Sequence, residues 1–467
     1  MLALLGLCWP QGVQAQDDPG EAIAPSEVIE GDAGEVGGPN GVGSGNVAFH
    51  PGVSLEGGFD SNVFFDDAQE RVTTSPVLGV VPKLSLKTRR PTSVDLTLDA
   101  SVLYLQYLSE DQKVLDQSGF DLKLDGKAIF NPNGAIALKI SDNFTRTNEA
   151  PNGVGFDSYN RVFNRLSGGV LIQPGGKVLT AEVGGAFSIF SHTYLPDLDR
   201  QMLSLGADVK WRFLPKTAVI AQLGWDFISY DTKQRTIPFH DDESIPSFLE
   251  PFVNDTGIQN IDSKPLRLQA GLAGLVGPRF SVVLLGGYGA GFYEEGEDFS
   301  GFIGRAEVAY EIGPTSRFRL GYMRDFADSS FANFFTFHKV YARHKQQLFG
   351  RLDLSLEGAF QLQEYALNPG PVLDQVSVDG VLGANAFSTD RRVDPVVLAK
   401  GELTFFITQI FNVGVRYQLD VNASDFVMIT GIVAPDDLRD PNDINTQGTA
   451  TAQFVKHRVF LTTGVQW

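Results

Sequence analysis

Hydrophobic and polar residues alternate with a period of two over most of the chain after residue 46. The pattern is clearest in 95–104, 120–128, 352–362 and 413–420, where apolar side chains fall on one parity and polar or charged side chains on the other. Because successive side chains of a β-strand point to opposite faces, this alternation predicts strands with one apolar and one polar face. The alternating stretches are each about 10 to 16 residues long and are bounded by turn residues.

Short turns and longer polar loops follow one another along the chain. Tight connections such as 131–134, 174–176 and 313–315 alternate with longer segments such as 231–262 and 366–390. An up-and-down barrel in one membrane produces this order, whereas a Greek-key sandwich does not. Eight turns and nine loops join about eighteen strands, with a range of about sixteen to twenty. We therefore predict an all-β fold: a transmembrane up-and-down antiparallel β-barrel of outer-membrane type, with both ends on the periplasmic side.

The last nineteen residues, 449–467, are predicted to form one amphipathic strand that ends on an aromatic residue. In outer-membrane barrels the terminal strand pairs with the first strand and its apolar face contacts lipid. The residues expected to close the barrel in this way are Val459, Leu461, Val465 and Trp467. The chain thus looks like an integral outer-membrane protein of a Gram-negative bacterium, a class that contacts lipid and lipopolysaccharide and is inserted by the barrel assembly machinery.

Composition agrees with a barrel and excludes other membrane folds. The 467 residues are 43% apolar, yet after residue 15 no apolar run approaches the length of about eighteen residues that a spanning helix needs. The 50 Gly, 35 Phe and 12 Tyr suit a large antiparallel sheet with Gly in its turns and aromatic residues at its rims. The single Cys8 lies in the predicted leader, so disulfides, thiol catalysis and Cys-ligated metals are excluded for the mature chain.

Three regions are expected along the chain. Residues 1–15 read as a signal peptide, with an apolar segment before Val13-Gln14-Ala15, although the missing positive n-region fits a start that is truncated. Residues 16–46 are rich in Gly, Pro and acidic residues and are expected to be a disordered periplasmic tail. Residues 47–467 form the barrel. The net charge of −19 comes largely from the tail and the loops, and this acidic balance argues against a nucleic-acid partner.

The polar face of the predicted strands should line the lumen. A barrel of about 16 to 18 strands leaves an aqueous channel unless loops plug it. The candidate lumen-lining residues are Asp95, Asp99, Asp121, Lys123, Asp125, Lys127, Arg305, Glu307, Arg351, Asp353, Glu357, Arg416 and Arg458. Two interpretations stay open. Neighbouring charges pair across strands to tolerate a wet interior, or they pass a hydroxyl-rich or charged solute along many weak contacts.

Catalytic chemistry finds no support in the sequence. The six histidines are scattered without metal-ligand spacing, and there is no Gly-x-Ser-x-Gly elbow. The run Gly286 to Gly291 resembles a phosphate-binding loop only superficially, since no helix follows it. Glycines in a barrel wall instead allow sharp coiling or close packing by a neighbouring loop. The expectation is a protein that is not an enzyme, with no catalytic residues, no cofactor and no metal site.

One local motif is more specific than the fold class. The segment Gly57-Gly58-Phe59-Asp60-Ser61-Asn62-Val63-Phe64 is similar to the opening of the β-barrel porin 2 family, and the strand expected at 76–86 resembles the second strand of that family. Barrels of this architecture include the integral outer-membrane proteins of myxobacterial polysaccharide export. The resemblance implies a passive conduit for a polysaccharide cargo, with a periplasmic polysaccharide export protein as its partner.

Other interpretations remain beside that resemblance. Asp60, Ser61 and Asn62 suit the exit from a strand, because their side chains can bond freed backbone groups in an Asx-type turn. A general or solute-specific porin for small-molecule diffusion is the main alternative function. A barrel whose loops carry a structural, adhesive or enzymatic role is a third, because a fold does not fix a function.

Overall fold

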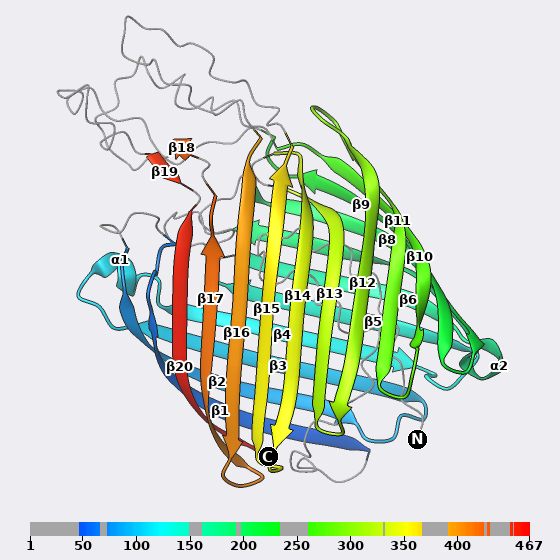
Figure 1. Ribbon diagram of the computed structural model, residues 1–467, viewed down its shortest axis with the longest axis horizontal. Coiled ribbons are helices and arrows are strands. Elements are labelled where there is room, and N and C mark those ends of the chain that lie inside the picture. The colour runs from blue at the N-terminus through cyan, green and yellow to red at the C-terminus, as the bar shows by residue number, and fades with distance from the viewer. Residues whose placement is uncertain are drawn as a thin grey trace, which may run out of the picture.

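The computed structural model describes residues 46–65, 72–148, 161–192, 198–233, 260–329, 332–366, 391–424, 427–429, 449–451 and 453–467. Within these ranges the chain forms one closed 18-stranded antiparallel sheet and a separate two-stranded sheet (Figure 1). The prediction of an all-β up-and-down barrel of about eighteen strands is confirmed. The predicted leader, the predicted tail as far as residue 45 and much of the long loops lie outside the described residues.

The barrel strands follow one another around the sheet in chain order. They are β1 (Val47–Asp60), β2 (Ser75–Thr88), β3 (Val94–Tyr107), β4 (Gly119–Phe130), β5 (Ile136–Thr147), β6 (Arg161–Ile172), β7 (Leu179–His192), β8 (Arg200–Leu214), β9 (Thr217–Tyr230), β10 (Ser263–Leu275), β11 (Phe280–Tyr293), β12 (Phe299–Gly313), β13 (Ser316–Asp328), β14 (Phe334–Leu348), β15 (Leu352–Tyr365), β16 (Val393–Phe406), β17 (Phe411–Asn422) and β20 (Phe454–Gln466). The ring closes because β20 pairs with both β17 and β1.

The remaining elements are short. β18 (Val427–Ile429) and β19 (Thr449–Thr451) pair with each other and not with the barrel. The helix α1 (Gln112–Leu115) begins after Asp111, whose side chain accepts a hydrogen bond from the Lys113 N–H. The helix α2 (Pro174–Lys177) forms the connection between β6 and β7. Among the described residues, no helix is long and apolar enough to cross a membrane.

The polar face of the strands is the inner face. Ser263 on β10 bonds Asp328 on β13, two strands lying between them. Since neighbouring strands lie about 4.8 Å apart, side chains on strands so far from each other can meet only on the concave side of the wall. The opposite face carries large exposed apolar side chains along nearly every strand. A closed barrel with a polar interior and an apolar exterior is the architecture of integral outer-membrane proteins of Gram-negative bacteria.

One predicted strand is wrong in its extent. Residues 449–467 do not form a single strand: β19 lies apart, and β20 begins only at Phe454. The partner strand β17 ends at Asn422, which pairs with Phe454, so the barrel offers no edge to the residues before it. Trp467 follows β20, and its N–H donates to the Pro51 carbonyl at 3.0 Å, at the end of the barrel that carries the short turns (Figure 1).

A charge on the outer face should be costly. Leu268 lies near the middle of β10, is 54% exposed, and pairs with Leu223 and Tyr288 on the neighbouring strands. Leu268→Arg should lower the free energy of unfolding by about 2–4 kcal/mol, because the guanidinium would face hydrocarbon. Denaturant titration of the barrel in lipid bilayers measures this. Gln269→Arg, on the inner face next to it, is the control, and an equal cost for both variants would contradict the assignment of the two faces.

Candidate functional site

The structure places all but one of the candidate lumen-lining residues on the inner face. They are Asp95 and Asp99 on β3, Asp121, Lys123, Asp125 and Lys127 on β4, Arg305 and Glu307 on β12, Asp353 and Glu357 on β15, Arg416 on β17, and Arg458 on β20. Arg351 lies elsewhere, in the exposed turn between β14 and β15. That turn takes up three residues, of which Phe349 and Gly350 have positive φ, so the strand that would have carried Arg351 begins one residue later.

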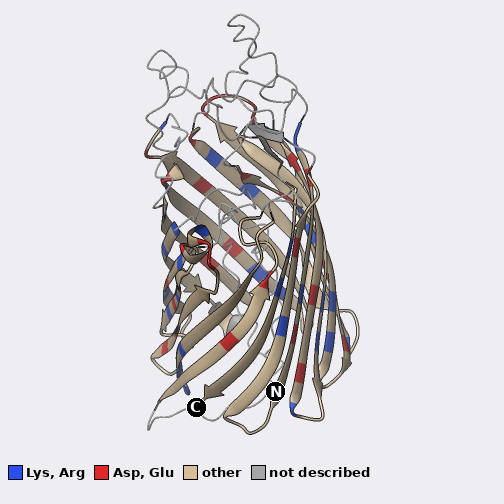
Figure 2. Cartoon of the chain, turned by 90° about the vertical axis from the view of Figure 1, so that its left-hand side faces the viewer, with Lys and Arg blue, Asp and Glu red and all other residues tan. Residues whose placement is uncertain are grey.

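Charged residues of both signs are interspersed along the strands (Figure 2). Across β2, β3 and β4 the three middle registers alternate in sign, and single aspartates, Asp121 and Asp95, occupy the registers on either side of them. One register holds Lys83 and Lys123, the next Asp99 and Asp125, and the third Lys87 and Lys127. The four lysines of the first and third registers, here called the lysine rows, are exposed.

Inward side chains are more buried along β7, β8 and β12 to β14 than along β3 and β4. Almost every inward side chain of β7 and β8 is buried, including Glu182, which bonds Lys139 at 2.9 Å. Around β12 to β14, Glu307 pairs with Arg305 at 3.1 Å and accepts the Tyr341 hydroxyl at 2.5 Å. By contrast, no residue of β3 or β4 is buried. The interior is therefore packed on one side and leaves an open strip along β3, β4 and the part of β2 from Lys83 onward.

Some of the predicted residues pair across strands, as the first of the two interpretations expects. Arg416 bonds Glu56 on β1 at 2.6 Å, and Arg458 bonds Asp420 on β17 at 3.3 Å. Lys123 lies 3.6 Å from Asp125 on its own strand, β4. Such pairs lower the cost of placing charges inside the barrel, because each keeps a partner when water is partly excluded.

Alternation along the sequence places Arg267 on the lumen-facing side but does not predict its partners. Arg267 on β10 bonds the carboxylate of Asp325 at 3.1 Å and lies 3.5 Å from that of Asp226. Its guanidinium also lies over the Phe326 ring, 4.3 Å from the centroid. These partners come from β9 and β13, and no local pattern in the sequence indicates that β10 and β13 meet.

An acidic residue, Asp262, lies at the extracellular rim immediately before β10. Partial burial alone would raise the pKa of Asp262, but hydrogen bonds from Lys233, from the Tyr230 N–H at 3.0 Å and from Ser229 at 3.1 Å outweigh it. The pKa of this carboxyl therefore lies below its ordinary value. Among the described residues, no group of three or more His, Cys, Asp or Glu is arranged to hold a metal ion.

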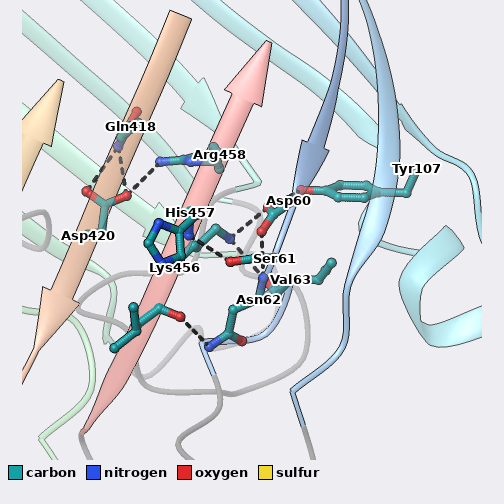
Figure 3. A network of polar contacts seen from close by, with 11 residues as sticks. Asp60, Ser61, Asn62, Val63, Tyr107, Gln418, Asp420, Lys456, His457 and Arg458 are labelled. Carbon is teal, nitrogen blue, oxygen red and sulfur yellow. Dashed lines mark hydrogen bonds and ion pairs between the residues drawn. The ribbon is translucent and has the colours of Figure 1, made fainter. Parts of the chain in front are cut away.

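The motif at 57–64 lies at the junction between the first and last strands (Figure 3). Asp60 and Asn62 are buried, and the Asn62 N–H donates to Asp60 at 3.0 Å, which is the Asx-type turn expected from the sequence. The Lys456 ammonium lies 3.0 Å from the Asp60 carboxylate, which also accepts the Tyr107 hydroxyl at 3.2 Å.

Backbone contacts extend this junction. The Ser61 N–H donates to the His457 carbonyl at 2.9 Å, and the His457 N–H donates to the Ser61 hydroxyl at 2.8 Å. The Asn62 amide donates to the Val455 carbonyl at 3.2 Å. We call this group of residues, 60–62 with 455–457, the seam clasp. Asp60, Ser61 and Asn62, which belong to the motif of the family resemblance, therefore reinforce the pairing between β1 and β20.

Comparison with known proteins gives barrels of the outer membrane. No family model and no curated protein matches the sequence. Among solved structures, the chain is similar to the outer membrane protein OpdK of Pseudomonas aeruginosa, with 13% identity, coverage of 90% of this chain and 99% of that one, and a TM-score of 0.41.

The siderophore receptor PirA of Acinetobacter baumannii matches with 8% identity, 89% and 80% coverage and a TM-score of 0.43. OccK5 of Pseudomonas aeruginosa matches with 9% identity, 90% and 98% coverage and a TM-score of 0.42. Similarity at these levels of sequence identity and TM-score does not indicate a substrate for the chain. The family resemblance noted in the sequence gains no support from these matches.

Proposed function

We propose that the protein is a passive outer-membrane channel for small polar solutes, with a preference for anions that arises from the lysine rows. The observation that carries the proposal is the asymmetry of the interior. Side chains pack against one another along β7 and β8, while the exposed lysines of β2 and β4 border the open strip. A solute moving along this strip meets charges one register at a time.

The balance between the lysine and aspartate registers favours anions. Asp125 accepts a hydrogen bond from the Asn143 amide, which compensates part of its charge, whereas its 3.6 Å contact with the Lys123 ammonium weakens both charges alike. The longer lysine side chains can also reach further from the wall than the aspartates. Several weak contacts made one after another suit transport, because a solute must leave each position as easily as it enters.

Export of a polysaccharide is the function that the family resemblance implies. Fewer features of the structure support it than support a small-solute channel. The resemblance rests on 57–64, and Asp60, Ser61 and Asn62 are engaged in the seam clasp. They therefore carry no information about the cargo. The packed half of the interior narrows the bore, which suits small solutes better than a polymer of bulky rings.

Reversing the charge of one lysine row should change the ion selectivity. Lys83→Glu combined with Lys123→Glu should shift permeability from anions towards cations. Each exchange is worth about 1 kcal/mol in a water-filled lumen, which corresponds to a severalfold change in the permeability ratio. The measurement is the reversal potential of the purified barrel in a planar bilayer under a salt gradient.

Lys264→Glu provides the matched control. Lys264 is exposed on the outer face at the extracellular end of β10, so the same charge change there should leave the reversal potential as it is. A cation-selective intact protein, or equal shifts in the control and the double variant, would show that the lysine rows do not set selectivity.

A further inference from the structure

The pairing between β12 and β13 stops partway up the barrel. Their register runs upward from the short turn to the pair Gly304 and Arg324, and none is formed above it. Both strands nevertheless continue, β12 through 299–303 and β13 through 325–328.

Each strand keeps its other neighbour over this stretch. β12 pairs with β11 as far as Phe299 with Gly291, and β13 pairs with β14 as far as Asp328 with Phe334. The interruption thus belongs to one seam of the wall. It lies at the end that carries the longer loops, which is the extracellular end of such barrels.

Side chains take the place of the missing strand pairing. The Phe326 N–H donates to the Asp325 carboxylate at 2.8 Å, and the Phe326 carbonyl accepts from the Arg267 guanidinium at 2.6 Å. Buried main-chain groups need such partners. Because both groups of Phe326 are satisfied without β12, the interrupted seam is a stable feature and not an unfinished ladder.

A buried aromatic cluster centred on Phe326 fills the interruption. The Phe326 side chain is fully buried and stacks on the Phe299 ring at 4.1 Å between centroids. The ring rests on the glycine-rich stretch of β11: a Cβ added at Gly289 would lie 2.7 Å from it, and one added at Gly291 would lie 3.1 Å away. The glycines therefore provide the slot that this ring occupies.

We propose that the interrupted seam is a lateral portal, separate from the axial route, through which apolar ring-bearing solutes pass between the outer leaflet and the lumen, with Phe326 as its seal. Opening breaks no β12–β13 backbone pairing above Gly304 and requires side chains of the Phe326 cluster to move aside. The slot suits a flat ring, since aromatic side chains and glycine line it. The Arg267 guanidinium over that slot also attracts π-systems.

The outer leaflet borders the portal through an apolar residue. Phe302 on β12 is 57% exposed on the outer face, one residue from buried Ile303, which packs with Phe326 inside. An apolar solute dissolved among lipid chains would meet this aromatic residue first. The lateral route does not depend on anion preference, so it can fail while the proposed axial function holds.

The test follows entry of an apolar probe into cells of a Gram-negative host. N-phenyl-1-naphthylamine, which fluoresces in an apolar environment, reports lateral entry, and hydrolysis of nitrocefin reports passage of a hydrophilic solute. Cells with the intact chain should take up the naphthylamine severalfold faster than cells without it. Phe326→Ala should raise that rate severalfold again, with nitrocefin entry unchanged.

Phe187→Ala is the matched control, because it removes the same kind of side chain from the lipid face of β7, away from the seam, and should leave naphthylamine entry at the intact rate. Gly289→Ala is a second variant that displaces the Phe326 ring without deleting it, and it should also speed entry. If Phe326→Ala does not insert into the outer membrane, Gly289→Ala still tests whether the Phe326 ring seals the portal.

Three results would overturn the portal: an intact chain that gives no entry above the empty host, variants at both Phe326 and Gly289 that leave naphthylamine entry unchanged, or variants that raise both probes together, which indicates a general leak. Heat-modifiable migration in gels verifies that each variant is a folded barrel.

Discussion

Arg267→Met should lower the free energy of unfolding of the barrel by about 3–5 kcal/mol, the usual cost of removing one partner from a buried ion pair. The Arg267 side chain is 14% exposed and serves the carboxylates of Asp226 and Asp325 as well as the Phe326 carbonyl. Methionine keeps the apolar stem but leaves two carboxylates without their cation. The neighbouring strands β9, β10 and β13 should loosen together.

Denaturant unfolding in lipid bilayers measures this effect. Lys264→Met is the control, since it removes a cation from the same strand at an exposed position on the outer face. A loss for Arg267→Met no larger than that of the control would show that water or another cation compensates the two carboxylates.

Lys456→Met should destabilise the seam clasp to a similar extent, again by about 3–5 kcal/mol. Lys456 and Asp60 are both almost completely buried, and their 3.0 Å ion pair joins the last strand to the first. Met in place of Lys456 leaves the Asp60 carboxylate with only the Tyr107 hydroxyl and the Asn62 N–H nearby.

A double-mutant cycle isolates the pair. Asp60→Asn in the Lys456→Met background removes the unpaired charge, so the double variant should lose less stability than the two single variants together. Unfolding in bilayers and the yield of heat-modifiable barrel give the readout. Additive losses would mean that the two residues stabilise the seam independently, and Lys400→Met, at an exposed inner position of β16, should cost little.

Local sequence patterns predicted the strands and turns because those elements depend on neighbouring residues. The succession of short turns and longer loops predicted the number of strands, and at the predicted turn 131–134 Asn131 adopts φ of 56°. The same reasoning failed at 449–467. Residues 449–451 are indeed extended, but they pair with β18, and the choice of partner is not a local property.

Contacts between distant strands could not be predicted. The Asx-type turn of Asp60 and Asn62 is local and was expected, but its ion pair with Lys456 joins residues at opposite ends of the barrel sequence. The meeting of Arg267 with Asp325 depends on the interruption between β12 and β13, which alternation does not encode. The glycines of β11 were expected to permit close packing by a loop, whereas the group that packs on them is the Phe326 ring of β13.

The size of the uncharged solutes that pass the channel tests its proposed function most directly. Liposomes containing the purified barrel are placed in isotonic solutions of sugars of increasing length, and swelling reports entry. The small-solute channel predicts fast entry of monosaccharides, a steep fall with size and exclusion of long oligosaccharides. Long oligosaccharides that enter as readily as monosaccharides would instead indicate a polymer conduit, and liposomes that do not swell in any sugar would contradict an open channel.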